Sequence, residues 1–555
     1  MPQYPKNELA QLVIASCSAN AIEHVVISPG SRNAPLTIGF SHHTAIKTYS
    51  IVDERCAAFF ALGLAQQLQK PVAVVCTSGS ALLNYYPAVA EAFYSDIPLV
   101  VISADRPSRM IDVGDGQTIR QENVFENHIL FSANLIVNDN LKEENLNLLE
   151  YALYVVNVEK GPVHINVPFD EPLYEITEKL FELEKVVYDT SEEPILVDEL
   201  QQYADIWNTS DKKMVLVGSS FPDELLQIQL NKITQDESVI VVTETTSNVY
   251  NAKFINSIDK TIFPLSDKEL AALKPEILLT LGGMIVSKKI KQYLRKFQPR
   301  HHWHIDAKRE LDTYFCLDKH FDVSPQLFFS QFFFLSEEKK GNYQQNWLAI
   351  KELRATKHHK FLAQCAYSDL KVFESILESI TDNIQLQLSN SSIIRYSQLF
   401  DVNNSLSVFC NRGTSGIDGS TSTAIGASVI NEKQTVFVTG DISFFYDSNA
   451  LWNKYIKNDF RIILINNNGG GIFKFIPGPK DSNALEYFET PHGLTAEHLC
   501  KMYGFKYSTA SNLSEVNNSL SDFYSESSHP KLLEIFTPSN ENDVVLKAYF
   551  NALKE

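Results

Sequence analysis

The sequence predicts an α/β protein built from three domains of the parallel-sheet type. Short β-branched runs alternate with longer amphipathic segments, and many of these runs end in Gly, Ser, Asp or Asn. Such alternation is typical of units in which a helix connects two parallel strands. A chain of 555 residues is also too long for one hydrophobic core, so its length favours several domains.

The first set of expected strands indicates an N-terminal domain over residues 1–180. Its β-branched runs are HVVIS (24–28), VAVVCT (72–77), LVVISA (99–104) and VHINVP (163–168). A charged stretch without glycine follows at residues 175–194. We expect this stretch to be an exposed connector between domains.

Two further sets of strands predict a central domain over residues 195–345 and a C-terminal domain over residues 360–555. The central strands are expected at residues 213–219, 239–244, 276–283 and 302–306. The C-terminal strands are expected at residues 384–391, 406–413, 435–441, 461–468 and 531–536. A polar helical segment near residues 340–360 separates the two sets.

Composition and charge exclude several classes of partner. Apolar residues form 44% of the chain and charged residues 21%, as in ordinary globular proteins. The chain has 48 basic and 67 acidic residues, and its net charge of −19 repels nucleic acid and anionic lipid. An anionic small substrate would therefore have to meet a local cluster of Arg and Lys.

The cysteines and the N-terminal segment predict a cytoplasmic protein. The seven cysteines are scattered without a CxxC pair, which is typical of reduced thiols and indicates neither disulfides nor a zinc site. The first residues, MPQYPKNELAQLVIASC, lack the basic start and apolar run of a signal peptide. No stretch reaches the length that spans a bilayer, so we expect no membrane insertion.

Polar residues at two strand ends of the third domain are suited to a metal ion. Asp441 follows the run TVFVTG and Asn467 follows the run RIILIN, with 25 residues between them. If these strands are parallel neighbours, both side chains lie at the carboxyl edge of the sheet, where α/β folds bind ligands. A carboxylate, an amide oxygen and the Gly469 carbonyl suit Mg²⁺ bound to a diphosphate. Gly-Asp and Asn-Asn-Gly are also common turn formers, so neither half is specific alone.

Taken together, the two halves resemble the metal-diphosphate motif of the thiamine-diphosphate enzymes. That motif begins Gly-Asp-Gly, whereas here Ile442 follows Gly440 and Asp441. A second match is SIVDERCAAFFALGLA (50–65), with Glu54 at the start of an apolar helix. In the family such a glutamate hydrogen-bonds the aminopyrimidine ring and promotes loss of the C2 proton. The alternative for Glu54 is an acid that only complements the helix dipole.

Further segments resemble those members of the family that join a 2-oxoacid fragment to isochorismate. These segments are SPGSRNAPL, SADRP, GDGQTIRQ, NSSIIR, NRGTSGIDGSTSTAIG and NNNGGGIF. The resemblance implies a transferase that decarboxylates 2-oxoglutarate on thiamine diphosphate and adds the succinyl carbanion equivalent to isochorismate, in menaquinone biosynthesis. It covers the N-terminal and C-terminal domains nearly throughout and is weak in the central domain.

The resemblance implies a role for each of a set of residues. Mg²⁺, or Mn²⁺ in its place, would bind Asp441, Asn467 and the carbonyl of Gly469. Thiamine diphosphate would contact Pro29, Glu54, Thr77, Gly416, Ile417, Gly440, Asp441, Ser443, Asn467, Gly469, Ile472 and Phe473. In this set Ile417 would be the apolar wedge that bends the cofactor.

The resemblance also implies the catalytic and substrate-binding residues. The expected catalytic residues are Glu54, Gln117, Arg395 and Arg412. The expected substrate-binding residues are Ser31, Arg32, Arg106, Gln117, Lys288, Lys289, Ser391, Arg395 and Arg412, because Arg and Lys bind the carboxylates of both substrates. The family more often has Arg where Lys289 stands, and both lysines could instead belong to a solvated helix face.

In the family the pyrimidine-binding domain of one subunit faces the diphosphate-binding domain of another. The resemblance therefore implies a homodimer or homotetramer with active sites between subunits. Two alternatives stay open: another thiamine-diphosphate enzyme, such as a 2-oxoacid decarboxylase or acetohydroxyacid synthase, and a non-catalytic paralogue that kept the fold. Glu54 argues against the second, because a pure binder needs no ring-activating acid. Residues 216–220 lack the GxGxxG turn that a flavin or nicotinamide site would favour.

Overall fold

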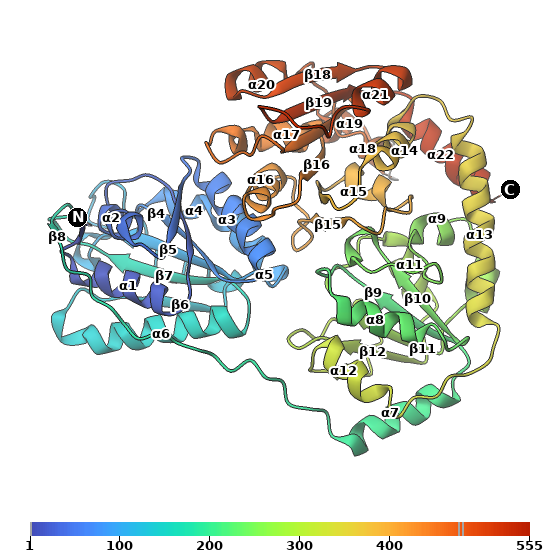
Figure 1. Ribbon diagram of the computed structural model, residues 1–555, viewed down its shortest axis with the longest axis horizontal. Coiled ribbons are helices and arrows are strands. Elements are labelled where there is room, and N and C mark those ends of the chain that lie inside the picture. The colour runs from blue at the N-terminus through green and yellow to red at the C-terminus, as the bar shows by residue number, and fades with distance from the viewer. Residues whose placement is uncertain (1–2, 476–477, 480–481, 555) are drawn as a thin grey trace.

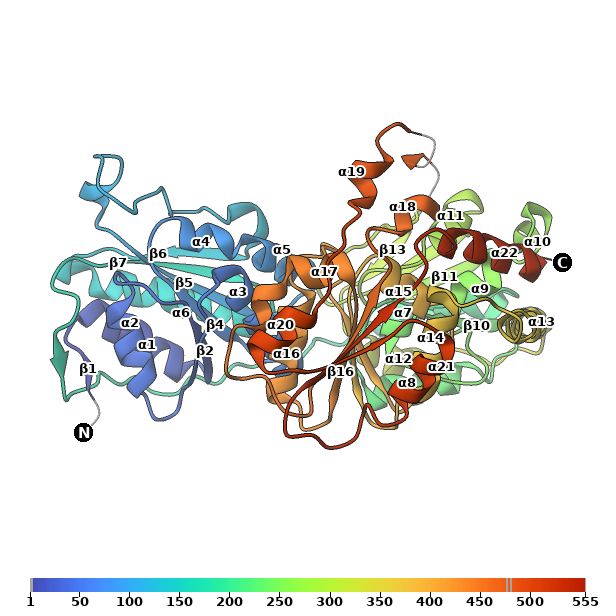
Figure 2. The same ribbon diagram turned by 90° about the horizontal axis from the view of Figure 1, so that it is seen from above.

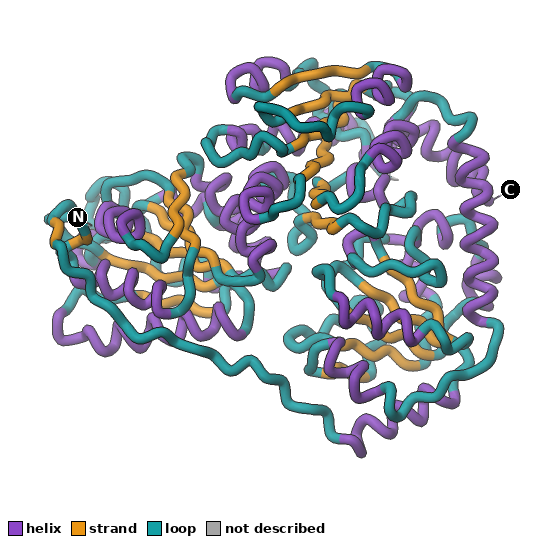
Figure 3. Tube along the Cα trace, viewed as in Figure 1, coloured by secondary structure: helices purple, strands orange, loops and turns teal. Residues whose placement is uncertain are grey.

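The computed structural model describes residues 3–475, 478–479 and 482–554, and it contains three separate parallel sheets (Figure 1). Helices cover the faces of each sheet, as the colouring by secondary structure shows (Figure 3). The prediction of three α/β domains is confirmed. The boundaries given to the domains stay a prediction.

The N-terminal sheet has the strand order β3-β2-β4-β5-β7-β6, and all neighbouring strands are parallel. Its strands are β2 (His24–Ile27), β3 (Lys47–Ser50), β4 (Val72–Cys76), β5 (Leu99–Asp105), β6 (Phe131–Asn134) and β7 (Val163–Pro168). Its helices are α1 (Glu8–Ala19), α2 (Ala34–His42), α3 (Glu54–Leu68), α4 (Ser80–Asn84), α5 (Tyr86–Tyr94) and α6 (Lys142–Val158). The four expected strands are present, and the sequence reading missed β3 and β6 because KTYS and FSAN are not apolar runs.

The connector after this domain is extended. The short strand β1 (Tyr4–Pro5) pairs antiparallel with β8 (Ile176–Thr177). Residues 178–196, all of which the structure describes, form no helix or strand before α7 (Val197–Thr209) begins. Figure 1 shows this segment running along the lower edge of the molecule to the central domain.

The central sheet is parallel, with the strand order β10-β9-β11-β12-β13. Its strands are β9 (Lys213–Val217), β10 (Val239–Thr243), β11 (Ile277–Leu281), β12 (His301–Ile305) and β13 (Lys319–Phe321). Besides α7, its helices are α8 (Glu224–Ile233), α9 (Ile258–Ile262), α10 (Asp267–Ala272), α11 (Lys288–Lys296) and α12 (Pro325–Phe332). The long helix α13 (Tyr343–Leu362) connects this domain to the next (Figure 1), and Figure 2 shows the same helix end-on.

The C-terminal sheet is parallel, with the strand order β15-β14-β16-β17-β19-β18. Its strands are β14 (Gln385–Leu388), β15 (Ser407–Cys410), β16 (Thr435–Gly440), β17 (Arg461–Asn466), β18 (Lys506–Ala510) and β19 (Lys531–Phe536). The direct parallel pairing of β16 with β17, expected from the sequence, is present.

The helices of the C-terminal domain differ widely in length. They are α14 (Asp369–Ser379), α15 (Ser392–Ser397), α16 (Ser420–Ile430), α17 (Asp441–Tyr446), α18 (Ile472–Phe475), α19 (Leu485–Glu489), α20 (Glu497–Tyr503), α21 (Leu513–Leu520) and α22 (Asn542–Lys554). Short 3-10 helices occur along the whole chain at η1 (Ser108–Met110), η2 (Glu126–His128), η3 (Asp139–Leu141), η4 (Thr245–Ser247) and η5 (Ser448–Leu451).

Two general expectations can be compared with the described residues. All seven cysteines are free thiols. Within the described part of the chain, every helix is too short or too polar to cross a membrane.

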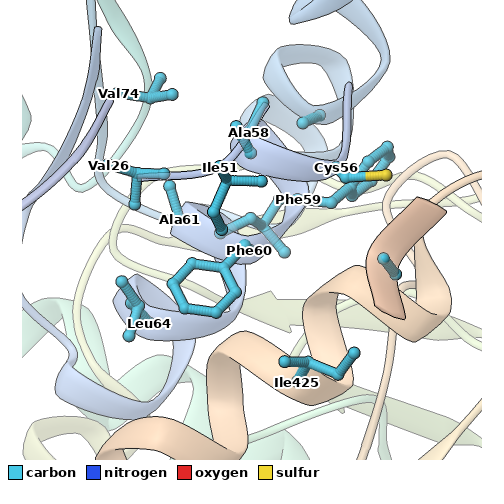
Figure 4. Close-up of a cluster of buried hydrophobic side chains, with 14 of the residues drawn as sticks. Val26, Ile51, Cys56, Ala58, Phe59, Phe60, Ala61, Leu64, Val74 and Ile425 are labelled. Carbon is cyan, nitrogen blue, oxygen red and sulfur yellow. The ribbon is translucent and has the colours of Figure 1, made fainter. Parts of the chain in front are cut away.

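Helices α3 and α16 pack closely, so that the N-terminal and C-terminal domains share one hydrophobic core. A Cβ on Gly63 would lie 2.1 Å from the carbonyl oxygen of Thr423, and one on Gly426 would lie 2.1 Å from that of Phe60. Glycine at both positions therefore allows the two backbones to approach. Figure 4 shows Phe60 of α3 and Ile425 of α16 within the same cluster of buried side chains.

We predict that Gly63→Ala destabilises the protein, although alanine favours a helix over glycine by about 1 kcal/mol. The added methyl group meets a backbone oxygen that cannot rotate away, so we expect a loss of about 1–3 kcal/mol. Thermal unfolding at one scan rate measures the effect. The matched control is Gly116→Ala, where a Cβ meets no atom within 4 Å. Equal unfolding temperatures for Gly63→Ala and the unchanged protein would contradict the close packing.

Candidate functional site

A cavity of about 270 Å³ lies at the carboxyl edge of the C-terminal sheet. Its walls include Asp441, which follows β16, and Asn467, which follows β17. All its described lining residues fall between Asp369 and Thr490, so the C-terminal domain forms it. This edge is where open α/β sheets bind ligands.

Asp441 links the end of β16 to the turn that follows β17. It is the first residue of α17 and is 3% exposed. Its Oδ2 accepts a hydrogen bond from the Gly469 backbone N–H at 2.9 Å, and its Oδ1 accepts one from Ile442 N–H at 2.7 Å. His492 Nε2 lies 3.4 Å from Asp441 Oδ2. Burial raises the pKa of Asp441, because desolvation disfavours the charged carboxylate.

Asn467 presents a buried amide oxygen beside this carboxylate. Its Oδ1 has no hydrogen-bond partner among the described residues, whereas its Nδ2 donates to Asp369 Oδ2 at 2.9 Å. Gly469 has φ +140°, which favours glycine, and its carbonyl accepts from Gly471 N–H at 2.9 Å with one of two lone pairs. An unpartnered buried oxygen calls for an explanation. The donor set of carboxylate, amide and carbonyl fits a hard cation such as Mg²⁺.

This candidate metal site is not a cluster of carboxylates or imidazoles. The described residues contain no group of three or more His, Cys, Asp or Glu side chains able to hold a metal ion. The expected site has a single carboxylate, and its other donors are an amide and a backbone carbonyl. The expected site is therefore compatible with the lack of such a cluster among the described residues.

Four of the other residues expected to bind the cofactor line the same cavity. They are Gly440, Ile417, Ser443 and Phe473. Ser443 Oγ donates to the Ile417 carbonyl at 3.0 Å, which connects α17 to the loop before α16. The carbonyl of Gly416 accepts from Asn390 Nδ2 at 2.7 Å. Ile472 begins α18 directly before Phe473 and is partly buried.

Arg395 and Arg412 form a cationic pair between the C-terminal and central domains. Both Nε atoms are buried and lack a hydrogen-bond partner among the described residues. Arg412 Nη1 donates to Asn390 Oδ1 at 2.6 Å, and burial, followed by the charge of Arg412, lowers the pKa of Arg395. Ser391, in the left-handed region at φ 68°, lies at the start of α15 and lines the cavity. Unpartnered guanidinium donors favour a carboxylate ligand.

The central domain places its lysines unequally. Lys288 is exposed at the start of α11. Lys289 is partly buried, and its Nζ lies 4.4 Å from the ring centroid of Phe263. The sequence reading missed Lys291, whose Nζ donates to the Ile285 carbonyl at 3.0 Å. Burial lowers the pKa of Lys291, and the charges of Arg412 and Arg395 lower it further, so this lysine lies near the arginine pair.

Two acidic residues of the central domain, also missed, balance these cations: the buried Glu244 and the partly buried Asp259. Glu244 is 2% exposed and accepts hydrogen bonds from the backbone N–H groups of Val286 and Ser287, both at 2.6 Å. Asp259 accepts one from Ser287 Oγ. Burial raises the pKa of Glu244 to about 7, although both hydrogen bonds and the charge of Arg412 oppose the shift. No local pattern distinguishes these acids in the sequence.

A second group of candidate residues lies at the carboxyl edge of the N-terminal sheet. Pro29 and Ser31 are exposed in the loop after β2, and Thr77 follows β4. These two loops touch, because a Cβ on Gly30 would lie 2.2 Å from the Cβ of Thr77. Arg32 N–H donates to Thr77 Oγ1 at 3.3 Å, and its Nη1 donates to the Phe169 carbonyl at 3.1 Å.

Arg106 and Gln117 belong to the same edge. Arg106 Nη1 donates to Ser78 Oγ at 2.7 Å, and its Nε donates to Asp115 Oδ2 at 3.0 Å. Gln117 is exposed and has φ 55°, in the left-handed region. A Cβ on Gly79 would lie 3.3 Å from the Gln117 carbonyl oxygen, so the two loops are adjacent.

Glu54 is the first residue of α3 and is partly buried. Burial raises its pKa, which favours the protonated form. After burial itself, the charge of Glu54 is the next cause that raises the pKa of the Cys76 thiol, so the carboxyl group lies on the side where β4 ends. The neighbouring Asp53 caps the helix by accepting from Cys56 N–H at 3.1 Å, and it also accepts from Asn449 Nδ2 at 2.8 Å.

Three family models match consecutive parts of the chain. Residues 7–129 match the N-terminal domain of thiamine pyrophosphate enzymes, which bind the cofactor also called thiamine diphosphate. Residues 191–388 match the middle domain of these enzymes. Residues 391–535 match their C-terminal cofactor-binding domain.

Full-length relatives are named 2-succinyl-5-enolpyruvyl-6-hydroxy-3-cyclohexene-1-carboxylate synthase. The relative from Flavobacterium psychrophilum is 53% identical over 552 residues, covering 99% of this chain and 100% of the relative. The one from Flavobacterium johnsoniae is 54% identical over 558 residues, with the same coverage of both chains. The one from Porphyromonas gingivalis is 38% identical over 551 residues, covering 95% of this chain and 94% of the relative.

We predict that Glu244→Gln changes how stability depends on pH. The folded pKa of about 7 lies above the ordinary value of 4.5, so between these values the unfolded chain is ionised while the folded protein keeps its proton. Stability from this group is therefore present below the lower value and lost as pH rises, by at most about 1.4 kcal/mol per pH unit. The variant lacks this loss.

Unfolding temperatures of the two proteins, measured at several pH values between these limits, test this sign. The advantage of the unchanged protein over the variant should shrink as pH rises. Glu193→Gln, which alters an exposed carboxylate in the connector, serves as the control and should give no such trend. A pH-independent difference for Glu244→Gln would contradict the titration assigned to this buried group.

Proposed function

We propose the reaction of this chain from its family, because the chain belongs to the thiamine-diphosphate enzymes and, within them, to the 2-succinyl-5-enolpyruvyl-6-hydroxy-3-cyclohexene-1-carboxylate synthases. It is a transferase of menaquinone biosynthesis that forms a carbon–carbon bond. In the proposed reaction it decarboxylates 2-oxoglutarate and adds the succinyl-semialdehyde carbanion equivalent to isochorismate, giving the product in the family name and CO₂. Identity of 53–54% over the whole length carries this proposal.

Thiamine diphosphate is the cofactor. When it is bound to the protein, it supplies a carbon nucleophile after losing its C2 proton. We propose that Asp441, Asn467 and the Gly469 carbonyl hold Mg²⁺ or Mn²⁺ and thereby the diphosphate. The unpartnered Asn467 Oδ1 supports this assignment. Gly416, Gly440 and Ser443 would border the diphosphate, while Ile417, Ile472 and Phe473 exclude water from the reacting carbon.

The proposed acid is Glu54, with Pro29 and Thr77 beside the pyrimidine ring. Its raised pKa supports this role, because a protonated carboxyl group can donate to a ring nitrogen and then exchange that proton. Glu54 also lies on the side where β4 ends, directly before Thr77, and this position supports the same assignment.

Both proposed substrates are dicarboxylates, and the overall charge of −19 repels them unless cations are concentrated at the site. Arg395 and Arg412 would bind the oxoacid through their unpartnered Nε groups. Ser31, Arg32 and Ser391 would orient isochorismate, and Gln117 would lie near the reacting atoms. Arg106, Lys288 and Lys289 would add positive charge around the entrance.

We further propose a homodimer or homotetramer whose active sites lie between subunits. The described walls of the C-terminal cavity come from one domain, whereas the expected ring-binding residues lie on the N-terminal sheet. Pro29, Ser31 and Gln117 are exposed in the single chain, so a second copy could bring its cavity to them. The cytoplasm stays the predicted compartment.

We predict that the purified protein with Mg²⁺ and thiamine diphosphate consumes 2-oxoglutarate rapidly only when isochorismate is present. Release of CO₂ and formation of the coupled product, followed by mass spectrometry, measure this requirement. The alternative is another decarboxylase or carboligase of the family. Faster turnover of pyruvate than of 2-oxoglutarate would favour it, and no turnover of the proposed pair would rule out the proposed reaction.

We predict that Glu54→Gln binds thiamine diphosphate but slows exchange of its C2 proton by about 10²-fold or more, because the amide cannot transfer a proton. Proton NMR after rapid quenching in D₂O measures the exchange. Glu8→Gln is the matched control, since Glu8 is the exposed first residue of α1 and can only complement a helix dipole. If both variants exchange like the unchanged protein, Glu54 has no part in activating the cofactor.

A further inference from the structure

Asp369 lies beside the candidate metal ligands, although the sequence places it 98 residues before Asn467. It is the first residue of α14, is 3% exposed and lines the same cavity. Its Oδ2 accepts a hydrogen bond from Asn467 Nδ2 at 2.9 Å, and its Oδ1 accepts one from Thr537 Oγ1 at 2.6 Å. Both oxygens are therefore occupied by neighbouring side chains.

The position of Asp369 is itself restrained from two sides. Its backbone N–H donates to Asn542 Oδ1 at 2.9 Å, and Thr537 directly follows β19. Asn542 is the first residue of α22 and also donates its Nδ2 to Thr537 Oγ1 at 3.4 Å. The carboxylate is thus held by elements that do not belong to the metal-diphosphate motif.

Both oxygens of Asp369 act as hydrogen-bond acceptors, and Oδ2 accepts from the NH₂ group of Asn467, which therefore faces Asp369. The amide oxygen then points away from Asp369, and it is the atom without a partner. The opposite orientation would bring two oxygens together at Asp369 and turn an NH₂ group toward a cation. Each contact would be repulsive.

We propose that Asp369 is the positioning residue that sets the amide orientation of Asn467 and thereby delivers its oxygen to the metal ion. This inference rests on the proposed metal site. Partners that orient a ligand in this way typically change metal affinity by about 10- to 100-fold when they are altered.

Asn466, one residue earlier, provides a built-in comparison. Its Nδ2 donates to Glu534 Oε1 at 2.7 Å and to the Leu494 carbonyl at 3.0 Å, while its Oδ1 accepts from Asn468 N–H at 3.1 Å. The amide of Asn466 is thus satisfied at both ends within the protein. The same kind of Asn–carboxylate pair therefore occurs at both of these consecutive residues, and of the two only the Asn467 pair leaves an oxygen free for a ligand.

The test is Mn²⁺ binding to the full-length protein in the presence of thiamine diphosphate, followed by electron paramagnetic resonance. Asp369→Asn introduces an amide that can donate or accept, so the orientation of Asn467 is no longer set, and we expect Mn²⁺ affinity to fall by about 10- to 100-fold. Asn467→Asp should also weaken binding, because it places two carboxylates at the same hydrogen-bond distance.

The double variant Asp369→Asn/Asn467→Asp exchanges the two groups and should recover affinity close to that of the unchanged protein. The amide at position 369 can then donate to the carboxylate at position 467, whose other oxygen faces the metal. A purely structural role does not predict this recovery. Glu534→Gln is the matched control: it should lower the unfolding temperature and leave Mn²⁺ affinity unchanged.

Two results would overturn the inference alone: unchanged affinity in Asp369→Asn, or a double variant that binds Mn²⁺ no better than the single variants. A different result would overturn the proposed metal site, and the inference with it. That result is an Asp441→Ala variant that binds Mn²⁺ as tightly as the unchanged protein.

Discussion

The parallel pairing of β16 with β17 is the constraint on which the candidate site depends. Gly440 lies opposite Ile465, so Asp441 and Asn467 both emerge at the carboxyl edge of the sheet. A shift of one residue would turn one set of side chains to the other face. The bond from Gly469 N–H to Asp441 Oδ2 joins the same two strand ends through the turn that follows β17. The cavity follows from this register, and so do the proposed positions of the metal ligands and the diphosphate.

The contact between α3 and α16 positions the N-terminal domain relative to the C-terminal sheet. Two glycines let these helices approach, and the start of α3 is bonded to the end of α17, where Arg55 Nη2 donates to the Tyr446 carbonyl at 2.8 Å. Glu54 is therefore held in a defined place relative to the C-terminal domain of its own chain. Each chain of a homo-oligomer would then carry two complementary half-sites, one on its N-terminal domain and one on its C-terminal domain.

The sequence predicted the parts of the fold and site that local patterns encode. Apolar runs ending in polar residues identified most strands and, with them, Asp441 and Asn467. Strands such as β3 and β6 were missed because their residues do not form apolar runs. Asp369 and Glu244 could not be found in this way, because neither belongs to a motif. Asp369 reaches the site through contacts with residues distant in the sequence, and Glu244 reaches it through the packing of the central domain. Lys291 stands two residues after Lys289, but only helix α11 determines which lysine turns toward the arginines.

The proposed active site combines Glu54 of one chain with the Asp441 cavity of another. Complementation between two differently tagged variants, Glu54→Gln and Asp441→Ala, tests it most directly. Each variant alone should be inactive, and subunit exchange between them should restore activity in the mixed oligomer, where one site has both unchanged groups. A mixed oligomer that is purified through both tags and remains inactive would contradict the claim.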